Sequence, residues 1–288
     1  MGNSVTTKPS VIKPALKLMA KNFFAHNVGR HAASLAYYLI FALFPMLIFL
    51  SNLFGLLDLN ATEITHALQR FLPNEIIGLI DSYLDYVSHT SSPLLLMFAF
   101  VFSIWFPMRA VKGLMDDVRT AYHLEKHVRP LTYTLRQLGY TVVLLFVIGF
   151  TLLLTVLGKQ VLGFVAYLLP ETTMRVSGYL LGIWQYVRFI PAGLLMYAAL
   201  GTLYAAALDK RQSIKTLMPG IVVSLSSWMI VSILFSYYVE QFANYSLIYG
   251  TLGAVIMLLM WLYMTAVFLI MGAELNAALL IVKGDLKP

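Results

Sequence analysis

The chain has 288 residues, of which 60% are hydrophobic and 11% are charged, and its formal net charge is +7. A soluble domain is usually about half apolar and about a quarter charged, so this composition indicates a protein that resides in a lipid bilayer. The absence of cysteine excludes disulfide bonds, thiolate metal sites and cysteine nucleophiles.

Residues 1–31 are predicted to form a cytoplasmic N-terminal segment with a short helix over 14–27. This helix separates apolar from basic side chains. The apolar face carries Leu16, Met19, Ala20 and Phe23, and the basic face carries Lys13, Lys17 and Lys21. The pattern favours an interfacial helix on an anionic membrane surface, and the alternative is an ordinary solvated helix face.

Six later stretches are apolar and long enough to cross the roughly 30 Å hydrocarbon core as helices. They lie near 32–57, 93–115, 139–158, 179–208, 217–239 and 249–282. We therefore predict an all-α, polytopic membrane domain over 32–282 with six transmembrane helices, followed by a cytoplasmic tail over 283–288. An amphipathic helix that begins at Asn74 is expected between the first two spans, on the outer side.

The distribution of Lys and Arg predicts the orientation of these spans. Basic residues concentrate in the N-terminal segment, in the second and fourth connections and in the tail, whereas the first connection is acidic. By the positive-inside rule, both termini are cytoplasmic, as an even number of spans requires. Topology thus accounts for most of the basic charge, and a nucleic-acid partner is not needed to explain it.

Arg188 is the charged residue that the sequence places nearest the middle of a span. It follows Gly178 by ten residues, about 15 Å of helix. Gln185 shares its face, and Pro191 predicts a kink that frees a backbone carbonyl. One interpretation is that Arg188 and Gln185 contact an anionic group of a substrate. The other is a structural arginine that neighbouring helices satisfy.

Arg109 and Glu274 are both predicted near the inner end of their spans. Arg109 lies about 24 Å from Pro93 along the helix, with a predicted kink at Pro107, and Glu274 lies about 36 Å from Gly250. We predict that they form an ion pair, which would be either a structural brace or an inner gate together with Asn276. The alternatives for Glu274 are a charge at the membrane boundary and a proton-coupling role. The small neighbours of Glu274 favour close helix contact; they are Ala273, Ala277 and Ala278.

Signatures of soluble enzymes are missing from the sequence. There is no Walker loop, no dinucleotide-binding glycine pattern and no G-x-S-x-G motif. The stretch "HLEKH" at 123–127 places its glutamate one position too late for a zinc-binding H-E-x-x-H helix. Asp116 and Asp117 are adjacent, so they point in different directions and cannot by themselves form the aspartate pair that an intramembrane protease needs. We expect no catalytic residues, no metal site and no cofactor.

Three stretches resemble a known family. They are "HAASLAYYLIFALFPMLIFL" at 31–50, "VKGLMDDVRTAYHLEKHVRP" at 111–130 and "IYGTLGAVIMLLMWLYMTAVFLIMGAELNAAL" at 248–279. Together they resemble the YihY/BrkB family of bacterial inner-membrane proteins, often labelled ribonuclease BN. The resemblance implies a six-span, multi-pass protein of the inner membrane, and some relatives are linked to serum resistance or to envelope lipid transport. Glu274 and Asn276 match the family's "GAELNA" motif.

The function predicted from these observations is transport or translocation of an anionic or amphiphilic envelope substrate, such as a lipid. The route would be lined by aromatic side chains, although packing would also explain them; they are Tyr37, Tyr38, Trp105 and Trp184. Membrane lipids are the expected partners, and a homo-oligomer is compatible with the sequence. The alternative is a non-transporting scaffold in envelope organisation or virulence. A membrane enzyme is less favoured, and a ribonuclease would need a His/Asp cluster that the sequence lacks.

Overall fold

The computed structural model describes residues 11–55, 69, 77–82, 85, 93–124, 130–168, 189–208, 213–241 and 244–286. Its helices are α1 (Ile12–Ala25), α2 (Val28–Gly55), α5 (Pro93–Ala121), α6 (Pro130–Leu168), α8 (Phe189–Ala207), α9 (Ile214–Gln241) and α10 (Asn244–Lys283). Every regular element in these described ranges is a helix, which confirms the predicted all-α class. The expected helix from Asn74 is described only at 77–82 and at residue 85, which are helical.

Five of the described helices are long and apolar enough to cross a membrane. The candidate spans are Val28–Ile48, Met97–Ala121, Leu131–Phe150, Lys215–Phe235 and Leu252–Lys283. Each overlaps one of five of the six predicted spans. The remaining one, predicted at 179–208, is described only from Phe189, where a shorter apolar stretch, Gly193–Ala207, forms most of α8.

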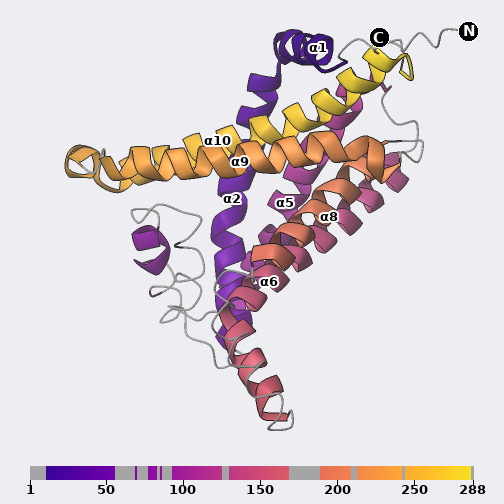
Figure 1. Cartoon of the computed structure of the whole chain (residues 1–288). Coiled ribbons are helices and arrows are strands. Elements are labelled where there is room, and N and C mark those ends of the chain that lie inside the picture. The colour runs from indigo at the N-terminus through magenta and orange to yellow at the C-terminus, as the bar shows by residue number, and fades with distance from the viewer. Residues whose placement is uncertain are drawn as a thin grey trace, which may run out of the picture.

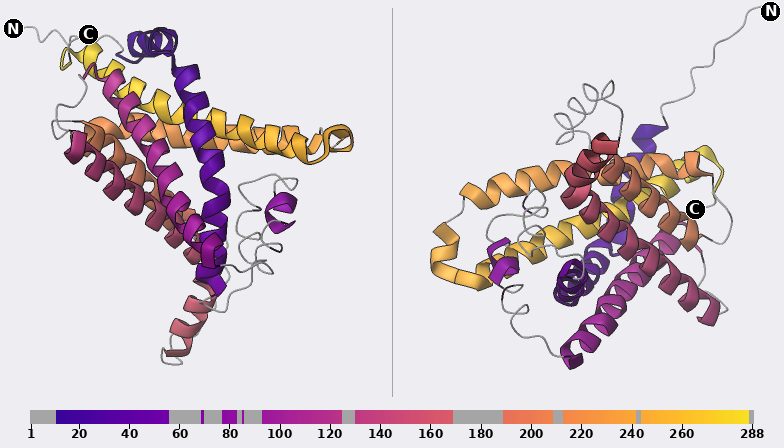
Figure 2. Two further views of the ribbon diagram at one scale, coloured as in Figure 1. Left: turned by 180° about the vertical axis from the view of Figure 1, so that it is seen from behind. Right: turned by 90° about the horizontal axis from the view of Figure 1, so that it is seen from below.

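The helices form two groups that meet around α2. Figure 1 shows α9 and α10 running side by side and passing across α2, while α5, α6 and α8 run together on the other side of the bundle. Contacts join α9 to α10, α10 to α2, α2 to α5, α5 to α6 and α6 to α8. Both views of Figure 2 show the α9–α10 pair extending beyond the other helices at one end.

The core lies where the C-terminal half of α10 meets α2, α5, α8 and α9. Its fully buried side chains include Val28, Met115, Tyr204, Ile221 and Ile270. Apolar residues that project away from this core are widely exposed on α5, α9 and α10. A helix that is apolar all round is expected where one side packs against protein and the other faces hydrocarbon.

α1 packs against the end of α10, and both lie at one end of the molecule in Figure 1. Ala15 and Asn22 form its buried side, whereas Leu16, Phe24 and the three predicted lysines are exposed. The predicted N-terminal helix is therefore confirmed as a helix. Its position on a membrane surface stays a prediction.

Candidate functional site

A sharp bend between α1 and α2 brings together the polar groups of this end of the molecule. Asn27 has a positive φ of 53°, a conformation that asparagine adopts more readily than most residues. Its carbonyl accepts hydrogen bonds from the backbone N–H groups of Arg30 and His31, at 3.0 and 3.2 Å, so α2 starts at once. The bend therefore places His26, at the end of α1, and His31, in the first turn of α2, close to α5 and α10.

Glu274 binds α1 through both carboxylate oxygens. Asn22 donates its amide N–H to Oε2 at 2.9 Å, and Nδ1 of His26 lies 2.5 Å from Oε1. The side chain of Glu274 is only 1% exposed. Because a buried carboxylate is costly without partners, these two contacts account for its presence in an apolar helix.

The predicted ion pair between Arg109 and Glu274 is wrong. The guanidinium of Arg109 instead lies over the ring of Trp105, with Cζ 4.8 Å from the ring centroid, in a cation–π contact. The residues of α5 at the level of Glu274 are Asp117 and Thr120, which border the same space as Glu274. Arg109 precedes Asp117 by eight residues, about 12 Å of helix.

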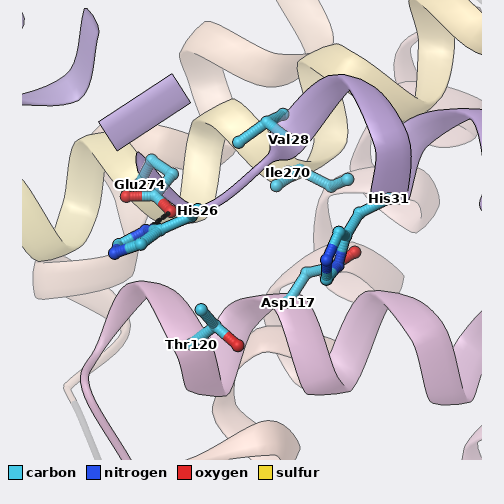
Figure 3. Close-up of a pocket in the computed structure, with 7 residues that line it drawn as sticks. All are labelled: His26, Val28, His31, Asp117, Thr120, Ile270 and Glu274. Atoms are coloured by element: carbon cyan, nitrogen blue, oxygen red, sulfur yellow. Dashed lines mark hydrogen bonds and ion pairs between the residues drawn. The ribbon is translucent and has the colours of Figure 1, made fainter. Parts of the chain in front are cut away.

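A second histidine–carboxylate pair joins α2 to α5. Nδ1 of His31 contacts Oδ1 of Asp117, whose side chain is 6% exposed. Figure 3 shows this pair beside the His26–Glu274 pair, with Val28 and Ile270 on the far wall. The space among these residues leaves no room for a water molecule. We call Asn22, His26, His31, Asp117 and Glu274 the polar elbow.

Beside the polar elbow, a cavity of about 340 Å³ lies between α2 and α5. Its lining includes Arg30, His31, Ser34, Tyr38, Asp116 and Asp117. Arg30 and Asp116 are exposed, so the cavity opens to the outside of the protein. Asp116 accepts a hydrogen bond of 2.5 Å from the hydroxyl of Tyr133 on α6, which fixes its position. The volume is at the lower end of the range found for ligand sites.

Two arginines hold the end of α8 near this region. Arg119 donates to the carbonyl of Ala207 at 3.0 Å, and Arg136 donates to the carbonyl of Ala206 at 3.1 Å. Cations at a helix C-terminus satisfy carbonyls that have no helical donor and interact favourably with the helix dipole.

Just beyond α5, burial raises the pKa of Tyr122 above its usual range, so its hydroxyl stays protonated.

Asn276 lies on the opposite side of α10 from Glu274, where its side chain binds the backbone of α9. Its Oδ1 accepts from the N–H of Gly220 at 2.7 Å, and its Nδ2 donates to the carbonyl of Leu217 at 2.8 Å. Asn276 is fully buried. The predicted gate role for Asn276 beside Glu274 does not fit this position, because both hydrogen-bonding groups of its amide are occupied by α9.

The contact between α9 and α10 beside Asn276 is unusually close, because Gly220 of α9 meets Gly272 of α10 there. A Cβ atom on Gly220 would lie 2.0 Å from the carbonyl oxygen of Gly272, and one on Gly272 would lie 1.8 Å from Oγ of Ser224. Ser224 donates to the carbonyl of Phe268 at 2.8 Å, and the hydroxyl of Tyr204 donates to the carbonyl of Leu269. We call Tyr204, Gly220, Ser224, Gly272 and Asn276 the glycine junction.

The other predicted site residues have mixed outcomes. Arg188, Gln185 and Trp184 lie outside the described residues. Pro107 lies inside α5, and Pro191 is the third residue of α8, so a kink there would involve residues that are not described. Tyr38 lines the cavity, and Tyr37 is exposed beside it with the two rings 5.6 Å apart.

Asn22, His26, His31 and Asp117 are the residues of the polar elbow that the sequence interpretation missed. His26 and His31 lie 91 and 86 residues before Asp117 and still farther before Glu274, so proximity in the sequence does not link them to these carboxylates. A usable signal was present nonetheless. Glu274 lies in an apolar span and Asp117 lies just beyond another, and the short stretch "HNVGRH" at 26–31 carries His26, Arg30 and His31 at the boundary of the first span.

Comparison with known proteins gives consistent matches over most of the chain. A family model described as "Virulence factor BrkB" matches residues 19–285. The ribonuclease-like protein YfkH of Bacillus subtilis is 29% identical over 264 residues, which cover 92% of this chain and 94% of that protein. A UPF0761 membrane protein of Chromohalobacter salexigens is 26% identical over 93% of this chain and 63% of that protein. No solved structure matches.

Proposed function

The chain belongs to the virulence factor BrkB family, and from that premise we propose that it moves an amphiphilic envelope substrate, such as a lipid, across or within the bacterial inner membrane. The proposal includes six spans, the sixth supplied by the stretch predicted at 179–208, and cytoplasmic termini. Arg188 and Gln185 remain part of it as an anion contact midway along that span.

The observation that carries the proposal is the open cavity of about 340 Å³ between α2 and α5. It combines charged and hydroxyl groups within a helix bundle whose outer faces are apolar. An isolated structural arginine or carboxylate needs a partner but no adjoining open space. A site that receives the polar part of an amphiphile needs charged groups and an open space beside them, and it needs access from the membrane side.

The two histidine–carboxylate pairs supply the framework of this site. His26–Glu274 holds α1 on α10, and His31–Asp117 holds the start of α2 on α5. In the proposed function they keep the bend between α1 and α2 in place beside the cavity. Glu274 thus keeps the bracing role that the sequence suggested, with a different partner.

A transport assay in reconstituted vesicles tests the proposal. Purified protein is incorporated into vesicles that carry trace fluorescent phospholipids, and movement between leaflets is followed by quenching from outside. Ser34→Trp fills the cavity from an exposed position, and Ser213→Trp adds the same side chain at the exposed residue before α9. We expect transport by the wild type and by Ser213→Trp, and a rate at least about tenfold lower for Ser34→Trp.

Two results would contradict the proposal. The first is no movement of any phospholipid in a panel of headgroups by folded wild-type protein, which would favour a scaffold. The second is full transport by Ser34→Trp, which would place the route elsewhere. The same preparation also tests the enzyme alternative, because hydrolysis of RNA or of the vesicle lipids would reveal a catalytic activity.

A further inference from the structure

Two opposite charges line the cavity without contacting each other. Arg30 lies in the first turn of α2 and Asp116 in the last third of α5, and both are exposed at the cavity. The two histidine–carboxylate ion pairs of this region, His26–Glu274 and His31–Asp117, do not involve Arg30 or Asp116. The cavity therefore presents one cation and one anion that are both accessible to a ligand.

The other groups that line the cavity do not pair with Arg30 or neutralise Asp116. His31 and Asp117 are bonded to each other, so their hydrogen-bonding capacity at this contact is already used. Tyr133 donates to Asp116 and thereby holds the carboxylate in place, while leaving its other oxygen available. Ser34 adds a hydroxyl to the lining. A ligand that carries both an anionic group and an ammonium group matches these charges better than an anion alone.

A row of aromatic rings leads away from the cavity along α2 and α5. It starts at Tyr38 in the cavity wall and continues through Tyr37, Phe41, Phe106, Phe102 and Phe98. Successive ring centroids lie 4.6 to 6.1 Å apart. Phe98 is 49% exposed and Tyr37 is 52% exposed. Since α2 and α5 are candidate membrane spans, hydrocarbon chains are what these rings would contact.

We propose that the cavity binds the headgroup of a phospholipid with a primary ammonium group, of the phosphoethanolamine type. The phosphate is held by Arg30, the ammonium donates to Asp116 and to Oγ of Ser34, and an acyl chain follows the aromatic row. Arginine suits phosphate because its guanidinium can donate two parallel hydrogen bonds. A trimethylammonium headgroup has no N–H to donate, so it fits less well. The inference rests on the proposed function for the role of the cavity as the substrate site.

Equilibrium binding tests this inference without any measurement of transport. Detergent-purified full-length protein is titrated with short-chain phosphatidylethanolamine, phosphatidylcholine and phosphatidylglycerol, and bound lipid is counted by native mass spectrometry. A fourth arm uses glycerophosphoethanolamine, which has the headgroup but no acyl chains. We expect phosphatidylethanolamine to bind about tenfold more tightly than the other two lipids, the scale of one charge-assisted hydrogen bond. The chain-free compound should bind at least tenfold more weakly.

Variants separate the two charges. Asp116→Asn should remove the preference for phosphatidylethanolamine over phosphatidylglycerol, while Arg30→Gln should weaken both lipids about equally. Asp285→Asn and Lys283→Gln remove the same charges from exposed positions at the end of α10, and they should leave all affinities unchanged. Circular dichroism and thermal unfolding confirm that each variant is folded.

The inference is overturned if the wild type binds the three lipids equally, or if Asp116→Asn retains the preference. Equal binding of the lipid and of glycerophosphoethanolamine would overturn the assignment to a lipid and leave a soluble phosphoethanolamine compound as the ligand. Transport without the predicted headgroup preference would refute this inference and leave the proposed function standing. The predicted preference without transport would refute the proposed function alone.

Discussion

The two sides of α10 around Glu274 and Asn276 show two ways in which a membrane helix accommodates polar side chains. Glu274 and Asn276 are two positions apart, and two positions on a helix correspond to about 200° of rotation, so the two side chains face opposite neighbours. Glu274 belongs to the polar elbow, which adjoins an open cavity. Asn276 belongs to the glycine junction, where backbone atoms of α9 and α10 touch.

This comparison separates structural from functional polarity by the space that surrounds each group. At the glycine junction the amide of Asn276 is fully paired with α9, and a methyl group would already clash with the backbone. Beside the polar elbow, Arg30 and Asp116 line a volume that a ligand can enter. An intramembrane polar residue therefore indicates a site only where free space and unshared charge accompany it.

The largest effect is expected at the glycine junction, from Gly220→Ala. The new methyl group would lie 2.0 Å from the carbonyl oxygen of Gly272, which is backbone and cannot turn away. We expect a loss of about 3 kcal/mol of folding free energy or failure to accumulate, because helices α9 and α10 must separate. Thermal unfolding in detergent measures it.

Gly139→Ala on α6 is the matched control, since nothing lies within 4 Å of the added methyl group. It should be neutral or slightly stabilising, because alanine favours a helix more than glycine does. Equal stability of the two variants would show that α9 and α10 are not in the close contact described.

Asn276→Leu should be the next most damaging change. It leaves the N–H of Gly220 and the carbonyl of Leu217 buried without their partner, and each such group costs about 1–3 kcal/mol. We expect a loss of about 2 kcal/mol or more in the same unfolding measurement. A variant as stable as the wild type would mean that the amide does not join α9 to α10.

The helices were predictable from sequence, but the faces on which they meet were not. Span positions follow from local hydrophobicity, and the five candidate spans agree with the prediction to within several residues at most ends. α6 is the exception, since it begins at Pro130 and continues to Leu168, well beyond the predicted 139–158. Its flanking turns are less hydrophobic than its centre, so a hydropathy window ends before the hydrogen-bonded helix does.

The wrong partner for Glu274 has a specific cause. The predicted depth of Glu274 depends on Gly250 as the outer boundary, yet α10 begins at Asn244 and has 40 residues, about 60 Å of helix. A helix that long exceeds the hydrocarbon thickness, so residue counts do not fix depth. The bend at Asn27, which delivers His26 to Glu274, depends on one residue's backbone conformation, which composition does not reveal.

A double-mutant cycle should reveal a smaller energy at the polar elbow. Glu274→Gln retains an oxygen that can accept from Asn22, but it removes the charge that faces His26. We expect a loss of about 1.5 kcal/mol for Glu274→Gln, and a similar loss for His26→Gln. The double variant should lose less than the sum of the two single variants, with a coupling energy of about 1 kcal/mol, because the two side chains share one interaction. Additive losses would show that His26 and Glu274 do not interact.

The smallest effect on stability is expected at the cavity itself, from Arg30→Gln and Asp116→Asn. Both side chains are exposed, and neither takes part in the His26–Glu274 or His31–Asp117 ion pair. Each substitution should therefore change the unfolding free energy by less than about 0.5 kcal/mol, as surface changes usually do. Losses as large as that of Asn276→Leu would instead make the cavity charges structural, and their contrast with the glycine junction would disappear. Small losses mean that these charges contribute little to folding, as expected of groups whose partner is a ligand.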